Sequence, residues 1–320
     1  MGNERNGHVT VVIPTYNRAH YLPGAIRSVL NQTAADRCDI IVVDDGSTDD
    51  TPGVVAQFGN HVRYLRQPNA GSAAARNAGI NASDAEFVAF LDVDDEWLPD
   101  KIERQLAVMT RCPEAALVAG RSYDRSSGAP LRLRPEPPVA TDTPVDFAPA
   151  LFKENFIPTP VVMVRRSALE RVGLFQPELR QAQDYHLWTR LACHGHGVCL
   201  SAPLAVITTD DPDSVSRDAA RLLRWSLRAR QLLRRELRVR PDCRPAWRRG
   251  MAACLAQLRD ECYRRREFAD ATRFGAASLM YRPWPRPKWE FGRLLASAAR
   301  AAVEPVRKAR HSSQVQCSAT

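Results

Sequence analysis

The chain has 320 residues, of which 44% are hydrophobic and 25% are charged, and its net charge is +9. This composition is ordinary for a globular protein with a sizeable core. No apolar run approaches the ~20 residues that span a bilayer, and eight scattered cysteines without a CxxC pair argue against a disulfide scaffold. The N-terminal stretch also lacks the apolar core of a signal peptide, so we expect a cytoplasmic protein.

The charge is unevenly distributed along the chain. Residues 214–320 contain 25 Lys+Arg against 9 Asp+Glu, a net +16, whereas the preceding residues contain 20 against 27, a net −7. Such an asymmetry indicates two functional regions. We therefore predict a first domain over residues 1–216 and a basic helical module, ending in a flexible tail, over residues 217–320.

Strands and helices alternate through the first region. Apolar, β-branched runs predict strands at 8–13, 39–45, 61–67, 85–92, 114–120, 159–166 and 197–208. Helical spacing of apolar residues, with Ser/Thr/Asp caps or glycine turns, predicts helices at 19–32, 46–58, 71–83, 99–109 and 182–193. Residues 121–149, rich in Pro, Arg, Asp and Ser, are expected to form a long loop or a short hairpin that lines a site.

The basic region is strongly helical in its pattern. Helices are predicted at 217–240, 245–266 and 268–281, before a proline-rich stretch. Arginine-rich helices are most often solvated faces, but they also bind anionic lipid head groups or nucleic acid. No nucleic-acid motif is present, so we favour anionic lipid over nucleic acid as a binding partner. We therefore expect the helices to bind the inner face of the membrane.

Alternating strands and helices predict an α/β fold with a doubly wound, mostly parallel sheet. Ligands of such folds bind beyond the carboxyl ends of the strands. Polar motifs follow three predicted strands at that edge: residues 14–17 (PTYN), Asp44 with Asp45, and residues 92–96 (DVDDE).

The acidic motif at residues 92–96 directly follows the buried run "EFVAFL". Asp92 and Asp94, two residues apart in a short loop, can converge on one Mg²⁺ or Mn²⁺, which also takes phosphate oxygens. Asp95 and Glu96 are expected to support the site or to begin the next helix, where acids favour the helix dipole.

The other polar residues fit a nucleotide. Asp44 and Asp45 can accept hydrogen bonds from a nucleobase and a ribose, although an acidic loop that caps the next helix is the simpler explanation. Tyr16 can stack on a base or pack in its loop. Arg76, in "GSAAARNAG", can hold a diphosphate or be a surface arginine.

Five stretches together resemble the motifs of family 2 glycosyltransferases, in the same order and spacing. They are "VVIPTYNRAHYLPGAIRSVLNQT", "IIVVDDGSTDDT", "GSAAARNAG", "FLDVDDEWLPDKI" and "QDYHLWTRLA". The resemblance covers about residues 8–216. It implies the GT-A nucleotide-sugar-binding fold and an inverting transfer of a sugar from a nucleotide-diphosphate donor to a hydroxyl acceptor, with a divalent cation.

The resemblance also implies roles for individual residues. The donor-binding positions are Pro14, Thr15, Tyr16, Arg18, Asp44, Asp45, Arg76 and Asp92. Asp94, together with Asp92, takes the metal-ligand position. Asp184 takes the position of the catalytic base, although by itself it reads as a helix N-cap. The acceptor is expected to be part of a cell-surface glycan or another glycoconjugate, carried on a lipid in many such enzymes.

Two positions depart from the family pattern. The residue before the base is often Glu and here is Gln183. Asp211 stands where many members have a histidine, and is either a metal ligand or a loop acid. Two other functions remain open: a sugar-phosphate nucleotidyltransferase, which "PTYNRAHYLPG" fits poorly, and a non-catalytic nucleotide-sugar-binding protein, against which the retention of Asp94 and Asp184 argues. The 121–160 region and the helical module are expected to select the acceptor.

Overall fold

The structure is a computed structural model that describes residues 7–211, 217–237 and 239–281, together with residues 296 and 300. Its strands are β1 (Val9–Thr15), β2 (Cys38–Asp44), β3 (Val62–Arg66), β4 (Phe87–Phe90), β5 (Glu96–Trp97), β6 (Ala115–Arg125), β7 (Arg132–Leu133), β8 (Met163–Arg165) and β9 (His196–Thr208). Its longer helices are α1 (Leu22–Leu30), α3 (Ser72–Asn81), α4 (Lys101–Arg111), α7 (Gln183–His194), α8 (Ala219–Leu237), α9 (Arg244–Arg264) and α10 (Phe268–Tyr281). Shorter helices are α2 (Thr51–Ala56), α5 (Ala148–Lys153) and α6 (Arg166–Val172).

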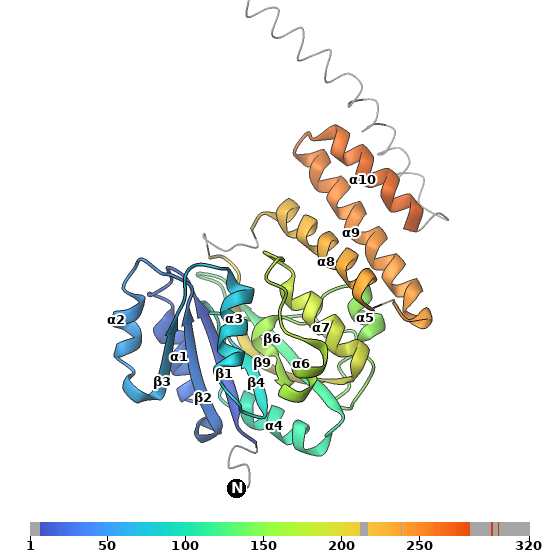
Figure 1. The fold of residues 1–320 in the computed structure, drawn as a ribbon. Coiled ribbons are helices and arrows are strands. Elements are labelled where there is room, and N and C mark those ends of the chain that lie inside the picture. Colours follow the sequence, from blue (N-terminus) through green and yellow to red (C-terminus); the bar gives the residue numbers. More distant parts are fainter. Residues whose placement is uncertain (1–6, 212–216, 238, 282–295, 297–299, 301–320) are drawn as a thin grey trace, which may run out of the picture.

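One sheet organises the molecule, in the order β3-β2-β1-β4-β8-β6-β9-β5 with β7 paired to β6. Strands β1 to β4 pair in parallel, as do β6 and β9, whereas β8 runs antiparallel to both of its neighbours. Helices cover both faces of the sheet (Figure 1). All seven residues of β1 are buried, because a strand covered on both faces exposes neither row of side chains. The expected mostly parallel α/β sheet is confirmed.

The region around residue 160 differs from the expectation. Residues 159–166 were expected to form one strand, but residues Thr159–Val161 form a 3-10 turn, only Met163–Arg165 pair as β8, and α6 follows at once. Pro160 has no N–H to donate to a sheet ladder, so pairing begins after it. In the stretch at 121–149, β6 continues to Arg125 and turns back as β7, so a short hairpin is present.

The three predicted C-terminal helices are present as α8, α9 and α10. They extend from one end of the sheet domain (Figure 1). Helix α8 packs on α7, and α9 packs on α5 and α10. Trp247 and Met251 of α9 belong to the same buried cluster as the strands of the sheet. The hydrophobic core is therefore continuous from the sheet into the helical module, and the division into domains at residue 216 stays a prediction.

No described helix is both long and apolar enough to cross a bilayer. The seven described cysteines are all free thiols, as the scattered pattern predicts.

Candidate active site

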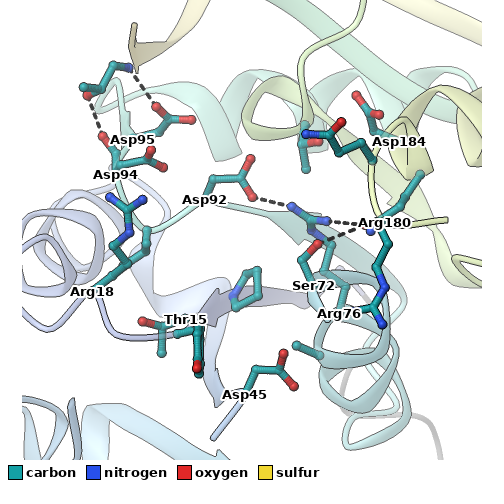
Figure 2. Close-up of a pocket in the computed structure, with 18 of the residues that line it drawn as sticks. Thr15, Arg18, Asp45, Ser72, Arg76, Asp92, Asp94, Asp95, Arg180 and Asp184 are labelled. Atoms are coloured by element: carbon teal, nitrogen blue, oxygen red, sulfur yellow. Dashed lines mark hydrogen bonds and ion pairs between the residues drawn. The ribbon is translucent and has the colours of Figure 1, made fainter. Parts of the chain in front are cut away.

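A pocket of about 430 Å³ lies where the carboxyl ends of β1, β2 and β4 meet the start of α7. Nine of the ten predicted site residues line it: Pro14, Thr15, Tyr16, Arg18, Asp45, Arg76, Asp92, Asp94 and Asp184. The first eight come from the carboxyl end of β1, from the loops after β1, β2 and β4, and from α3, as expected for this fold. Asp184 arrives from α7, far along the chain, and completes the pocket (Figure 2).

Asp44 is the predicted site residue that does not line this pocket. Its side chain is fully buried, and its two carboxylate oxygens accept hydrogen bonds from the backbone N–H of Ser47, at 2.7 Å, and from the hydroxyl of Tyr64, at 2.5 Å. Successive side chains at a strand end point to opposite faces, so Asp44 and Asp45 cannot both face a ligand. Asp44 holds the loop after β2, and its assignment as a donor contact is corrected.

Asp45 faces the pocket but is also bound to the loop that begins α3. Its carboxylate accepts hydrogen bonds from the backbone N–H groups of Ala70, at 2.9 Å, and Gly71, at 2.8 Å, and from the side chain of Gln67, at 2.7 Å. Gly71 has a φ of 93°, a left-handed conformation that favours glycine. Asp45 therefore fixes the turn from which α3 presents Arg76.

Arg76 is a buried cation at the centre of the pocket. Its guanidinium donates to Asp92 at 2.5 Å and to the side-chain oxygen of Gln183 at 3.2 Å, and it lies over the ring of Phe175. Figure 2 shows Arg76 pointing toward Asp92 and toward the segment that leads into α7. Ser72 donates to the same Gln183 oxygen at 3.1 Å. Gln183 thus joins α3 to α7, and Arg76 is ordered by one carboxylate and one neutral amide.

The carboxylates of the acidic loop after β4 lie in different environments. Burial, followed by the charge of Asp92, raises the pKa of Asp94, and no other described residue donates a hydrogen bond to its carboxylate. Such an unpartnered carboxylate beside a second one is a donor set that a hard divalent cation fits. Asp95 is buried, and its carboxylate accepts a hydrogen bond from the backbone N–H of Thr208 at 2.9 Å.

Neither Asp95 nor Glu96 begins a helix, since α4 starts at Lys101. Glu96 lies in β5, which pairs with β9, and forms an ion pair with Arg125 at 3.0 Å. Asp95 and Glu96 therefore both attach the acidic loop to the region of β9, and their expected role at the helix start is wrong.

Arg18 and Asp211 form an ion pair at the edge of the pocket. The side chain of Asp211 is only 2% exposed, so it is not an exposed loop acid. Its charge adds to the raised pKa of Asp94, after the larger effects of burial and of Asp92. Arg18 therefore reaches the pocket with its charge already opposed by a buried carboxylate.

Asp184 lies in the first turn of α7, and it is not the N-cap, since that position is Ala182. Its carboxylate accepts a hydrogen bond from the side-chain amide of Asn155 at 2.9 Å. Burial raises the pKa of Asp184, while the hydrogen bond from Asn155 lowers it. A raised pKa makes the ionised form a stronger base, which suits a group that accepts a proton.

A second group of potential metal ligands is explained by an arginine. Among the described residues, the ligand atoms of Cys262, Glu267 and Asp270 lie within 4.8 Å of one another. The guanidinium of Arg224 donates to all three of these side chains. The cluster is thus an arginine site that joins α8 to the α9–α10 turn.

The chain matches the model of the family described as Glycosyl transferase family 2 over residues 10–173, more than half its length. The chain belongs to glycosyl transferase family 2. The matched region holds the loops after β1, β2 and β4 together with α3, and therefore nearly all of the predicted donor side of the pocket.

Curated glycosyltransferases match little more than half of the chain. A putative teichuronic acid biosynthesis glycosyltransferase of Bacillus subtilis, TuaG, is 34% identical over 204 residues, which is 60% of this chain and 77% of TuaG. An uncharacterised glycosyltransferase of Rickettsia prowazekii is 29% identical over 183 residues, which is 56% of this chain. The chain spans only 57% of the length of that relative.

Solved structures share the fold over nearly the whole chain. S. aureus TarS 1-349 in complex with UDP-GlcNAc superposes with a TM-score of 0.60 at 17% identity, covering 94% of this chain and 92% of that one. The Pyrobaculum calidifontis mannosyltransferase PcManGT, in complex with GDP-Man and Mn²⁺, has a TM-score of 0.58 at 20% identity, covering 96% and 85%. The GT-A fold is thus shown for this family 2 member.

Several pocket residues were not singled out as donor or catalytic residues. Arg180 is exposed and lines the pocket, with its side chain beside the start of α3 (Figure 2), and it forms no ion pair or hydrogen bond with the described residues. Ser72 and Gln181 also line the pocket, and Asn155 lies beside it at Asp184. The sequence signal for Arg180 is its place three residues before Gln183, in the segment that leads to the predicted base Asp184.

Proposed function

We propose that this protein transfers a sugar from a nucleotide-diphosphate donor to a hydroxyl acceptor with inversion at the anomeric carbon. The observation that carries the proposal is the placement of Asp184 in one pocket with Arg76 and the Asp92–Asp94 pair. A lone carboxylate cluster would only suggest cation binding. A base opposite cationic and metal-binding groups is what a single displacement at carbon requires.

The donor diphosphate is proposed to lie between the acidic loop and α3. Arg76, held by Asp92 and Gln183, offers charge-assisted hydrogen bonds to its oxygens, and so does Arg180, which has no ion-pair partner among the described residues. Asp92 and Asp94 would hold a divalent cation, which when bound neutralises charge on the leaving nucleoside diphosphate. Tyr16 lines the pocket and is 47% exposed, and we propose that it stacks on the nucleobase.

Asp184 is proposed to take the acceptor proton. As the acceptor oxygen attacks the anomeric carbon, its O–H bond gives the proton to the Asp184 carboxylate. The bond from that carbon to the diphosphate oxygen breaks on the opposite face, and the electron pair leaves with the nucleotide. Asn155 orients the carboxylate by its hydrogen bond, and burial favours its protonated product state.

The acceptor is proposed to belong to a cell-surface glycan, in line with the name of the relative TuaG. A peripheral position on an anionic membrane is proposed from α8. Arg221, Arg228 and Arg235 are exposed, are spaced by seven residues and form no ion pairs with the described residues. Seven residues are close to two helical turns, so the three guanidinium groups share one face with the partly exposed Trp225 and Leu232.

A donor panel tests the reaction. We expect UDP-GlcNAc, GDP-mannose or a related nucleotide sugar to release its nucleotide diphosphate in the presence of Mn²⁺ and a glycoside acceptor. Asp184→Asn should lower kcat by roughly 10²–10⁴-fold with little change in nucleotide affinity, because the substitution removes only the proton acceptor. Asp94→Ala should instead abolish the response to Mn²⁺. Unchanged turnover in both variants would contradict the proposal.

A further inference from the structure

A second pocket of about 760 Å³ adjoins the candidate active site. The two pockets share Ala182, Asp184 and Leu222 in their linings. The carboxylate of Asp184 therefore lies at the junction of two cavities. One of them contains the cationic and acidic groups described above, and the other contains none of Asp92, Asp94 or Arg76.

We propose that this second pocket is the acceptor site, and that it takes a glycoside whose sugar hydroxyl reaches Asp184 and whose apolar aglycone lies along the pocket. This inference rests on the proposed transferase function. An inverting displacement needs the acceptor to approach from the side opposite the leaving group, with the base between the two substrates. Among the described residues, Asp184 has that relation to the two cavities.

The walls of the pocket come from two regions of the chain, and only the first of them lies within the residues that match the family model. One wall is formed by residues 120–122, 134–138 and 153–158 of the sheet domain. The facing wall is formed by α8, through Leu222, Leu223 and Ser226, and by α9, through Gly250, Ala253 and Gln257. The helical module is thus part of the proposed acceptor site.

The module is docked closely enough to form a defined wall. Arg230 of α8 is buried and donates to the backbone oxygens of Phe152, at 2.7 Å, and Lys153, at 3.1 Å, and to the hydroxyl of Tyr185, at 2.9 Å. A Cβ at Gly250 of α9 would lie 2.2 Å from the Phe152 oxygen, so only glycine permits this approach. Both helices are therefore fixed directly against the end of α5.

The chemistry of the lining indicates an amphipathic ligand. Four prolines at 135, 137, 138 and 158, two leucines at 222 and 223, and Phe156 line the pocket, interspersed with Arg121, Arg134, Glu136 and Glu154. Polar groups gather near Asp184, where Asn155 bonds the carboxylate, and Lys153 adds an exposed ammonium without an ion-pair partner among the described residues. Hydrogen-bonding groups beside proline and leucine side chains suit an amphipathic ligand, such as a sugar attached to an apolar aglycone.

The test compares octyl β-D-glucopyranoside with methyl β-D-glucopyranoside, below the concentration at which the former makes micelles. Saturation-transfer NMR on the full chain with UDP and Mg²⁺ should show contacts to the octyl chain. Ala253→Trp fills the pocket from the exposed face of α9, and Ser226→Phe fills it from α8. Ala276→Trp, an exposed position of α10 outside this pocket, is the matched control.

We expect both filling variants to lose the octyl contacts and to lower kcat/KM for a glycoside acceptor roughly tenfold or more. Their UDP affinity should stay at the wild-type value, and so should both readouts in Ala276→Trp. If the filled variants kept the wild-type kcat/KM and the octyl contacts, the assignment of this pocket as the acceptor site would be overturned. Equal kcat/KM for the methyl and octyl glycosides would overturn the proposal that the aglycone is apolar. Octyl binding in this pocket without any sugar transfer by the wild-type protein would support the binding site and overturn the transferase function.

Discussion

The side-chain amide of Gln183 accepts a hydrogen bond from the guanidinium of Arg76, with 3.2 Å between Oε1 and Nη1. Among the described residues, the other side-chain hydrogen-bond partner of Arg76 is Asp92, so the arginine bonds to one carboxylate rather than two. Glu at position 183 would give Arg76 two carboxylate partners. The neutral amide keeps the arginine in place while leaving part of its charge for a ligand.

Gln183→Glu is therefore expected to weaken nucleotide binding. A second carboxylate beside Arg76 would oppose a diphosphate in the same pocket, because charges a few ångströms apart in a protein interact by a few kcal/mol. We expect the affinity for UDP or GDP, measured by calorimetry with Mg²⁺, to fall roughly tenfold, or about 1.4 kcal/mol. Gln181→Glu is the control, since Gln181 lines the same pocket without bonding Arg76. An equal loss of nucleotide affinity in both variants would show that net charge alone causes the effect.

Asn155→Ala is expected to change the pH dependence of turnover. The hydrogen bond from Asn155 lowers the pKa of Asp184, against a larger opposing effect of burial. Its removal should raise that pKa further, and a base must be ionised to act, so the acidic limb of the kcat profile should move to higher pH. A hydrogen bond to a charged group contributes about 1.5–3 kcal/mol, which corresponds to roughly one to two pH units. Asn155→Asp, which adds a charge, should move the limb in the same direction; a profile unchanged in both variants would contradict the role.

The parts of this site that sequence could predict are local ones. The loops after β1 and β4 follow long apolar runs, so their place at the sheet edge follows from strand periodicity. Asp44 and Asp45 are adjacent, and composition cannot say which of them faces the pocket; the contact of Asp44 with Tyr64 decides it. Asn155 and Arg180 lie in irregular segments without periodicity. Their contacts depend on how the chain returns to the sheet.

In the helical module, too, the local structure can be predicted from the sequence but the tertiary contacts cannot. Its three helices follow from the spacing of leucines among arginines. Its docking depends on a buried arginine, Arg230, and on Gly250, whose roles appear only when α8 and α9 meet α5. The arginine-rich pattern of residues 217–240 therefore combines exposed arginines with others, Arg230 and Arg240, that bond to the sheet domain.

Lys101 gives the folded protein a pH-dependent stability. It is fully buried at the start of α4, where its ammonium lies over the ring of Trp97 and donates to Gln105 at 2.7 Å. Burial lowers the pKa of Lys101 to about 7, whereas in the unfolded chain a lysine holds its proton up to about pH 10.4. Between these values the unfolded state binds more protons, so the free energy of unfolding should rise with pH by up to about 1.4 kcal/mol per unit.

Lys101→Met should flatten this rise. Denaturant unfolding from pH 7 to pH 10 measures it, and Lys153→Met, at an exposed lysine, is the control that should keep the wild-type slope. A Lys101→Met protein with the same slope as the wild type would show that Lys101 stays protonated in the folded state.

The basic face of α8 makes the proposed membrane contact testable. Arg221, Arg228 and Arg235 lie on a different side of the helix from Leu223, Ser226 and Arg230, which face the second pocket and the sheet domain. A membrane on that basic face would lie across α8 from the pocket proposed for an apolar aglycone, and would not cover the contacts that hold the module. The two proposals therefore concern opposite sides of one helix.

Replacing Arg221, Arg228 and Arg235 by Glu is expected to abolish flotation with vesicles that contain phosphatidylglycerol. Each arginine near an anionic surface contributes about 1 kcal/mol, so the loss of three should weaken binding by roughly 100-fold or more. The matched control replaces Arg27, Arg111 and Arg132, which are exposed on the sheet domain, and makes the same change in net charge. Wild-type binding should weaken with salt and should be absent on neutral phosphatidylcholine vesicles, because the attraction is electrostatic. If the control triple variant loses binding as fully as the α8 variant, net charge and not this face of α8 governs the association.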